Sequence, residues 1–218
     1  MTSLDPFLMI VALGALAVLP FAAMMVTSFT KVIVVLSLVR NALGLQQVPP
    51  GIVLNGLAMV LSFYVMYPVG IAAYKAGMAQ LPEASQGVPV SSLVAAVDHA
   101  KEPLKAFLLK HSRPQEREFF NGSAEVVMGK EVASTLVETD FVVLIPAFVS
   151  TELTEAFEMG FLLFLPFLVI DLLVASALLA LGMQMMSPTM VSLPFKLLLL
   201  VWLDGWTRLL HALVLTYR

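Results

Sequence analysis

The chain has 218 residues, of which 60% are hydrophobic and only 12% are charged, and its mean hydropathy is +0.94. This is the composition of a membrane protein. The net charge is −3 and no basic stripe with interleaved aromatic residues occurs, so nucleic acid is excluded as an expected partner. Cysteine is absent, which excludes disulfides, thiol catalysis and cysteine-based zinc sites.

Four apolar segments are predicted, each long enough to cross about 30 Å of hydrocarbon as a helix. They cover residues 6–30, 51–74, 141–181 and 190–216. We expect the first segment to be retained, because no basic residue precedes it as in a signal peptide. It should form a hairpin with the second segment, and Lys31 and Arg40 should lie in the connecting loop. Short basic loops stay cytoplasmic, so the amino terminus is predicted to lie outside.

A polar insert follows, and it carries more than half of the charged residues of the chain. Loops of this length are translocated largely regardless of charge, which predicts a periplasmic location. Apolar residues at helical spacing predict a helix around Leu93–Leu108, a second helix ending at Asn121-Gly122, and a third over 126–137. The domains expected are an N-terminal apolar hairpin (1–74), a small helical periplasmic insert (75–140) and a C-terminal apolar hairpin (141–218). The predicted fold class is an all-α membrane protein.

The third apolar segment contains Pro146 and Pro166, which predict either two helices or one broken helix. Three glutamates, Glu152, Glu155 and Glu158, recur at every third residue and form an acidic helix face. We favour a solvated face just outside the bilayer. The alternative is an acidic surface that lines a conduit or docks a basic partner.

Asp171 lies inside the apolar run of the third segment. One central Asp costs about 3 kcal/mol on insertion, and each Leu, Ile, Val or Phe contributes roughly −0.3 to −0.6 kcal/mol, so this segment still inserts. The carboxylate should then face protein and pair with Lys31 or Lys196. We favour an interhelix or intersubunit lock over a proton relay.

Other polar residues of the apolar segments predict contacts between or within helices. Asp204 and Arg208 have the i, i+4 spacing of an intrahelical ion pair. Asn55 is most simply an interhelical hydrogen-bonding group, although it has the chemistry to coordinate an ion.

The most informative stretch is a short uncharged turn between the third and fourth apolar segments. Leu181–Pro188 contains Met183, Met185 and Met186. Flexible, polarizable thioethers in place of the usual polar or basic turn residues indicate packing against other protein. We interpret these side chains as the seal of a pore.

No enzyme signature is present: the sequence contains no HExxH, GxSxG or P-loop motif, and its three histidines are isolated. We therefore predict that the chain is not an enzyme, and we expect neither a cofactor nor a metal site.

Three blocks of residues, in order and spanning nearly the whole chain, resemble the FliP/SctR family, the R component of the type III secretion export apparatus. The first block is Arg40-Asn41-Ala42-Leu43-Gly44-Leu45-Gln46-Gln47-Val48-Pro49. The second is Pro146-Ala147-Phe148 with Glu152, Ala156-Phe157 and Gly160-Phe161. The third joins Pro166-Phe167, Asp171, Leu181–Pro188, Pro194-Phe195-Lys196 and Asp204-Gly205-Trp206. The first block looks more like the virulence-associated injectisome branch than the flagellar one.

The resemblance implies an export-gate subunit of the bacterial inner membrane. A pentamer of this subunit would assemble with small Q/S-type subunits and one R/T-type subunit into a helical cone raised toward the periplasm. Its pore would conduct unfolded secreted proteins and the first rod or needle subunits, with a methionine ring in the closed gate. This chain departs from many relatives at Gln184, where they carry another methionine.

Two other functions stay open at this point. A subunit of an ion-coupled transporter is suggested by Asp171, Lys196 and Asn55, although we see no repeated halves with broken helices. The second is a structural scaffold whose pore lies in another subunit. Within the resembled family, the flagellar version of the export gate is also possible.

Overall fold

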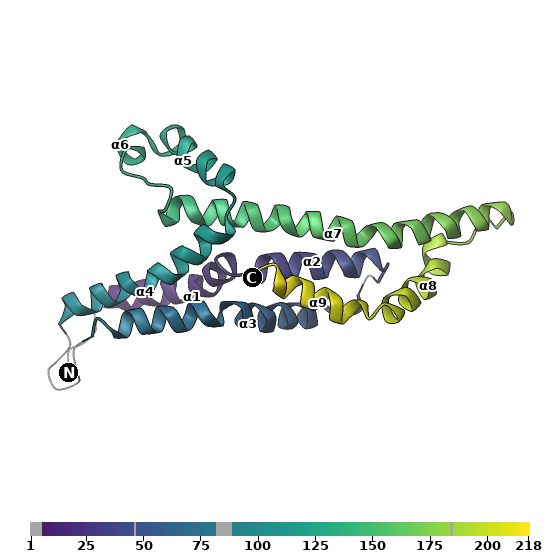
Figure 1. Ribbon diagram of the computed structural model, residues 1–218, viewed down its shortest axis with the longest axis horizontal. Helices are drawn as coiled ribbons and strands as arrows, with labels where there is room; N and C mark the ends of the chain where they lie inside the picture. The colour runs from purple at the N-terminus through teal and green to yellow at the C-terminus, as the bar shows by residue number, and fades with distance from the viewer. Residues whose placement is uncertain (1–5, 46, 82–88, 184) are drawn as a thin grey trace. The chain divides into compact units, whose positions relative to one another are not determined.

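The computed structural model describes residues 6–45, 47–81, 89–183 and 185–218, and every regular element in these ranges is a helix (Figure 1). The helices are α1 (Pro6–Met25), α2 (Phe29–Ala42), α3 (Gly51–Met78), α4 (Val90–His111), α5 (Pro114–Met128), α6 (Lys130–Ala133), α7 (Phe141–Ala180), α8 (Pro188–Trp202) and α9 (Gly205–Leu215). The prediction of an all-α chain is confirmed. The cone and the periplasmic location of the insert stay predictions.

The chain divides into two compact units, each of which joins segments that are distant in sequence. One unit consists of Met1–Thr30 and Pro68–Thr151, and the other consists of Lys31–Tyr67 and Glu152–Arg218. This division reflects packing. The expected segments 1–74, 75–140 and 141–218 describe membrane topology, and they stay a prediction.

Helix α2 replaces the expected basic loop. Lys31 and Arg40 both lie inside Phe29–Ala42, so the prediction that they belong to a connecting loop is wrong. The physical reason is an apolar stripe at helical spacing, because Val32, Val35, Leu36 and Val39 are all buried. The connection between α2 and α3 carries no charge of its own, and the predicted orientation of the amino terminus stays a prediction.

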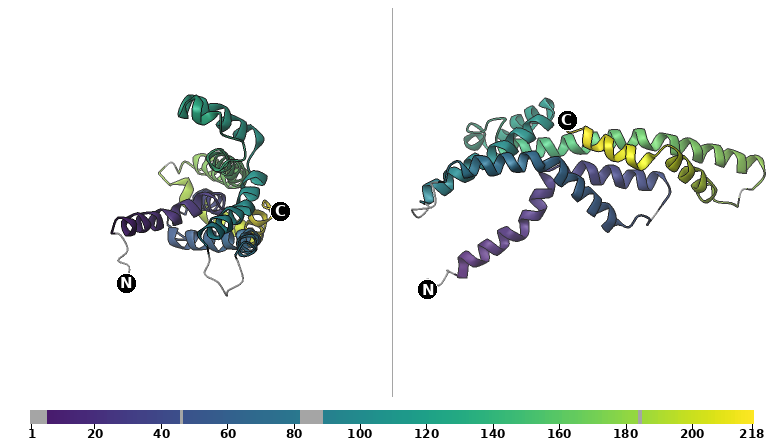
Figure 2. Two further views of the ribbon diagram at one scale, coloured as in Figure 1. Left: turned by 90° about the vertical axis from the view of Figure 1, so that its left-hand side faces the viewer. Right: turned by 60° about the horizontal axis from the view of Figure 1, so that its bottom comes forward.

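Helix α7 is one continuous element of 40 residues (Figures 1 and 2). The expectation of two helices or a broken helix at Pro146 and Pro166 is therefore wrong. A proline removes only one backbone donor, and in a long apolar helix the intact turns on either side keep the helix continuous.

The insert also differs from its predicted helices. Helix α5 continues through Asn121 and Gly122 as far as Met128, where Gly129 ends it with a φ of +87°. The expected helix over 126–137 is reduced to the four residues of α6. A glycine with a positive φ is the actual stop signal, and it lies seven residues beyond Gly122.

Two apolar cores position the sites described below. In the first unit, Phe107 and Leu108 of α4 are buried with Leu144 and Phe148 of α7, and the rings of Phe107 and Phe148 lie 5.7 Å apart. In the second unit, the α2 stripe is buried together with residues of α3, α7, α8 and α9, including Leu54, Ala156, Phe167, Leu200 and Leu213.

Two described helices, α3 and α7, are long and apolar enough to cross a membrane. The number rises to four if α1 with α2, and α8 with α9, each count as one broken span. The fourth apolar segment was expected to be continuous over 190–216, but α8 and α9 meet at a bend of 62°. The chain is thus a membrane protein by helix length and composition.

Candidate functional site

The methionine turn is closed by a glycine at the end of α7. Gly182 adopts a φ of +72°, its N–H donates to the Leu179 carbonyl at 3.1 Å, and the Met183 N–H donates to the Leu178 carbonyl at 2.9 Å. This hydrogen-bond pattern is a Schellman motif, which fixes the direction in which the chain leaves the helix. Met183 is therefore held by backbone geometry, directly after the last turn of α7.

All three methionines are uncovered in the single chain. Met185 has 101% of its reference surface exposed, and Met183 and Met186 have 41% and 44%. Pro188 begins α8 immediately after the turn. The turn therefore presents a small thioether surface between two helix ends. Gln184 lies outside the described residues.

Asp171 pairs with Lys196 in a buried network that joins α7, α8 and the end of α2. Lys196 Nζ lies 2.6 Å from Asp171 Oδ2 and donates to the Ala42 carbonyl at 2.9 Å. Ser192 Oγ donates to the other Asp171 oxygen at 2.5 Å. Lys196 is 2% exposed, so its ammonium group is enclosed by protein, and it hydrogen-bonds to both Asp171 Oδ2 and the Ala42 carbonyl oxygen. Because Ala42 is the last residue of α2, the ammonium also lies at the negative end of that helix.

Lys31 belongs to a different cluster. Its Nζ lies 2.8 Å from Glu152 Oε1 and 2.8 Å from Glu155 Oε2, and 4.4 Å from the centroid of the Tyr217 ring. Lys31 is 1% exposed and Glu152 is fully buried. Of the two lysines named as partners for Asp171, Lys196 is thus the one in contact, and Lys31 anchors α2 to α7 elsewhere.

The acidic face predicted from the glutamate spacing is not uniformly solvated. Glu152 is buried, Glu155 is partly buried and Glu158 is exposed. The prediction of a solvated acidic face is therefore wrong at Glu152. Successive positions three residues apart rotate around a helix by about 300°, so a series of three glutamates drifts from the buried side of α7 to its outer side.

Tyr217 is a member of this cluster that the sequence reading missed. Its hydroxyl donates to Glu152 Oε2, the oxygen not paired with Lys31. Burial raises the pKa of the Tyr217 hydroxyl above its ordinary value, and the neighbouring Glu152 carboxylate raises it further. The phenol therefore stays protonated and acts as a donor. Its position next to the last residue gave no signal in the sequence.

Asp204 and Arg208 do not form the expected ion pair. Asp204 adopts a left-handed conformation (φ 50°) at the break before α9, and its carboxylate accepts a hydrogen bond from Thr207 Oγ1 at 2.8 Å. The i, i+4 argument fails because Asp204 precedes α9 instead of lying inside it. Arg208 lines an apolar cavity of about 440 Å³ with Val39, Phe167, Leu200 and Leu209.

The remaining predicted polar residue, Asn55, is exposed on α3. Within the part of the chain that the structure describes, no group of three or more His, Asp or Glu side chains is arranged to hold a metal ion. The structure thus brings together Asp171 with Lys196, and Lys31 with Glu152 and Glu155, but it does not bring Asn55 to either cluster.

Apolar helices of membrane-spanning length, joined by buried ion pairs, define this chain as a helical membrane protein with several candidate spans. The chain belongs to the FliP family, whose family model matches residues 12–213. The family resemblance read from the sequence is therefore confirmed.

Similar proteins from three bacteria match nearly the whole chain. The "Pathogenicity-related ORF2" protein of Xanthomonas campestris pv. glycines is 52% identical over 97% of this chain and 96% of its own length. The "Hypersensitivity response secretion protein HrcR" of Ralstonia nicotianae is 50% identical over 96% of each chain. The "Yop proteins translocation protein R" of Yersinia pestis is 47% identical over 98% of this chain and 97% of its own.

Proposed function

We propose that this chain is a core export-gate subunit of a bacterial type III secretion system. It would lie in the inner membrane and form, with other subunits, a gated pore for unfolded proteins. Two of the most similar relatives carry names that describe secretion or translocation, at 50% and 47% identity. The match of the family model over most of the chain supports the same assignment.

The methionine turn is the observation that carries this proposal. Three thioether side chains stand exposed at the end of a 40-residue apolar helix, and Gly182 fixes the turn that presents them. Several copies of such a turn around one axis would form an apolar constriction. Unbranched methionine side chains would exclude ions by dewetting, yet they would yield to a passing polypeptide.

Assembly with further copies and with other secretion subunits follows from the apolar surface that one chain leaves uncovered. On α7 and α8, Leu162, Leu173, Leu198 and Val201 are each more than half exposed. The pentamer, the small Q/S-type subunits and the R/T-type subunit are part of this proposal, as are the rod or needle subunits as first cargo. Small exposed residues near the end of α7, such as Ala177 and Ala180, permit close helix approach.

The buried ion pairs have a structural role in this proposal. Lys196 is enclosed and already contacts Asp171 and the Ala42 carbonyl, which suits a lock between helices. An ion-coupled transporter would need polar groups that converge on an accessible site. Asn55 is on another helix and exposed, so an ion-coupled transporter has less support.

The export-gate role is tested by replacing Met183, Met185 and Met186 with alanine in the complex purified with its partner subunits. We expect complexes of normal composition whose closed state leaks ions into liposomes, because alanine is too short to fill the constriction. Replacing the same three residues with leucine keeps apolar volume and should preserve most of the seal.

Met78→Ala is the matched control, because Met78 is 49% exposed on α3 and lies far from the turn in sequence. It should leave both conductance and secretion unchanged. If the triple alanine variant conducts and secretes like the unaltered complex, the gate assignment is wrong. Rescue of effector secretion, compared with rescue of motility, in strains lacking the corresponding subunit separates the injectisome version from the flagellar one.

A further inference from the structure

A groove with an apolar end and a more polar end follows α5 in the polar insert. One end is a hollow of about 310 Å³ lined by Phe119, Phe120, Val127, Met128, Val142 and Pro146. A second hollow of about 500 Å³ is lined by Gln115, Glu118, Phe119, Gly122 and Ser123. The two hollows share Phe119 and Ser123, so they adjoin on α5, and we treat them together as one groove.

The first hollow is lined mainly by apolar side chains, whereas the second is lined by polar residues and Phe119. Phe119 is 64% exposed and Val127 is 74% exposed. Val126, the neighbour of Val127 in the chain, and Val142, which lines the first hollow, are also exposed. A contiguous exposed apolar surface in a polar segment indicates a binding site for another molecule. From Gln115 to Met128 the helix rises about 20 Å, which matches a helical segment of roughly thirteen residues.

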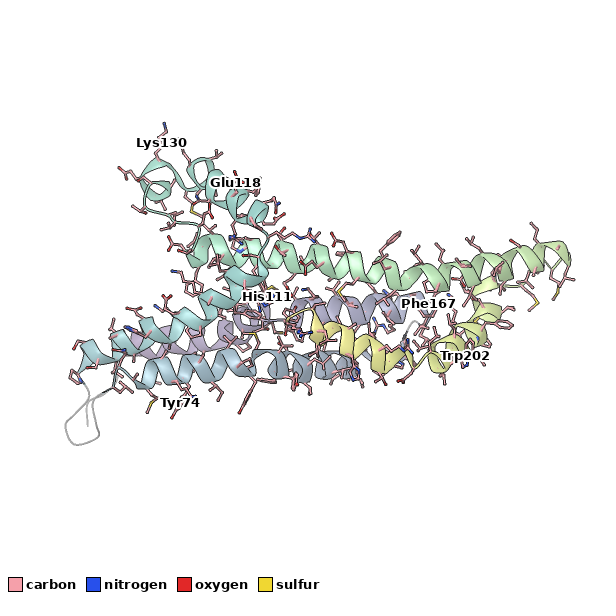
Figure 3. The ribbon with its side chains drawn as sticks, viewed as in Figure 1. Tyr74, His111, Glu118, Lys130, Phe167 and Trp202 are labelled. Atoms are coloured by element: carbon pink, nitrogen blue, oxygen red, sulfur yellow. The ribbon has the colours of Figure 1, made fainter. Side chains whose placement is uncertain are left out.

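The elements that form the groove carry an excess of negative charge. Glu118, Glu131 and Glu138 are exposed and Glu116 is partly exposed, and within the described ranges none of the four is joined to a cation by an ion pair. Figure 3 shows Glu118 on α5 and Lys130 at the start of α6.

The nearby cations are already engaged. The Arg117 guanidinium donates to the carbonyls of Leu109 and Ser112 at the end of α4. Lys130 lies 3.4 Å from Glu125. Between residues 113 and 140 the chain carries six carboxylates and three cations, so this region keeps an excess of negative charge.

We propose that this groove binds an amphipathic helix of a partner protein, with an apolar stripe flanked by lysine or arginine. The apolar floor would receive the stripe, as in other helix-in-groove complexes, and the glutamates would select the basic flanks. Anionic lipid is a poor occupant because the glutamates repel it. An isologous contact with a second copy would bring two acidic surfaces together, and the cross-link described below tests for a heterologous contact with a second copy.

The first test uses the purified secretion complex and a fluorescent 18-residue synthetic helix with a leucine stripe and lysine flanks. A twin peptide carries glutamate in place of lysine. We expect the lysine peptide to bind at least tenfold more tightly than the glutamate peptide, with affinity falling as salt is raised. Glu118→Lys should reduce this preference.

Variants locate the bound peptide. A side chain at Gly122 would extend into open space, so Gly122→Phe should fold, fill the groove and weaken binding at least tenfold. Val127→Asp should also weaken it. Val94→Asp is the matched control, because Val94 is 56% exposed on α4, outside the groove lining. This variant should bind the lysine peptide with unchanged affinity.

A photoreactive residue at position 127 in the assembled complex provides a second readout. The proposal requires a cross-linked segment with an apolar stripe and basic flanks. The proposal is overturned if the two peptides bind with equal affinity, or if Gly122→Phe leaves the affinity unchanged. A cross-link to a second copy of this chain also overturns it. These measurements report binding and not secretion, so their failure would leave the proposed gate unaffected.

Discussion

The buried pair between Asp171 and Lys196 gives the sharpest stability prediction. Lys196→Met keeps the length and the apolar stem of the side chain but removes the ammonium that contacts Asp171 and the Ala42 carbonyl. The Asp171 carboxylate would then retain only the Ser192 hydroxyl as a partner among the described residues. An uncompensated charge next to an apolar core is strongly unfavourable.

Breaking a buried ion pair by removing one partner costs about 3–5 kcal/mol. The Asp171 side chain is 25% exposed, and solvent stabilises part of the remaining charge. We therefore expect Lys196→Met to lower the free energy of unfolding by about 3 kcal/mol, the lower end of that range. Adding Asp171→Leu removes the stranded charge, so the double variant should be more stable than the single one, with a coupling of about 2 kcal/mol.

The assay is thermal or denaturant unfolding of the solubilised protein, followed by fluorescence of Trp202 and Trp206. These are the two tryptophans of the chain; Trp202 lies on α8, the helix that carries Lys196, and Trp206 lies on α9. Lys101→Met is the matched control. It breaks an exposed 2.8 Å pair with Asp98 on α4 and should change stability hardly at all. If Lys196→Met is as stable as the unaltered protein, or the double variant as unstable as the single one, the lock is refuted.

Three further predictions use the same unfolding measurements. Gly160→Ala should cost about 1–3 kcal/mol, because its new Cβ would clash with Leu38 Cδ1 and lie 3.2 Å from Leu38 Cγ. Adding Leu38→Ala, which removes both of these atoms, should recover part of that stability. Gly182→Ala should cost about 1 kcal/mol because of its positive φ, whereas Gly70→Ala, in open space within α3, should stabilise by about 0.5–1 kcal/mol. Burial and Glu152 raise the pKa of Tyr217 in the folded state. The unfolded chain loses the Tyr217 proton near pH 10, whereas the folded protein still holds it at that pH. Its contribution to stability is therefore complete below that pH and declines above it. The unaltered protein and Tyr217→Phe should therefore differ by the absorbance of one tyrosinate only after both have unfolded.

The all-helical class and the pairing of the Asp171 carboxylate with a cation could be predicted, because both follow from the energetics of short segments. A carboxylate in an apolar helix requires a cation, and few lysines lie outside the insert. The choice between Lys31 and Lys196 depends on which helices pack together, which no short-range pattern records. Lys31 and Glu152 are separated by more than half of the chain.

Two other predictions were wrong although the sequence contained the pattern that indicates the observed structure. The charges of Lys31 and Arg40 suggested a loop, although the buried stripe from Val32 to Val39 had the period of a helix. The dipeptide Asp204-Gly205 is a turn signal, yet the i, i+4 spacing to Arg208 suggested a continuous helix. In both cases a charge pattern was preferred to a backbone or burial pattern.

The distribution of polar and apolar contacts bears on how the proposed gate would assemble. Lys31 and Lys196 find their partners within one chain, so packing these helices against neighbours would leave neither lysine unpaired. The methionine turn, α8 and the part of α7 after Gly160 instead carry exposed apolar side chains. Contacts of this kind depend on packing and small residues, not on fixed hydrogen-bond geometry. Such an interface can separate at the methionine turn while the ion-paired helices of each subunit stay intact.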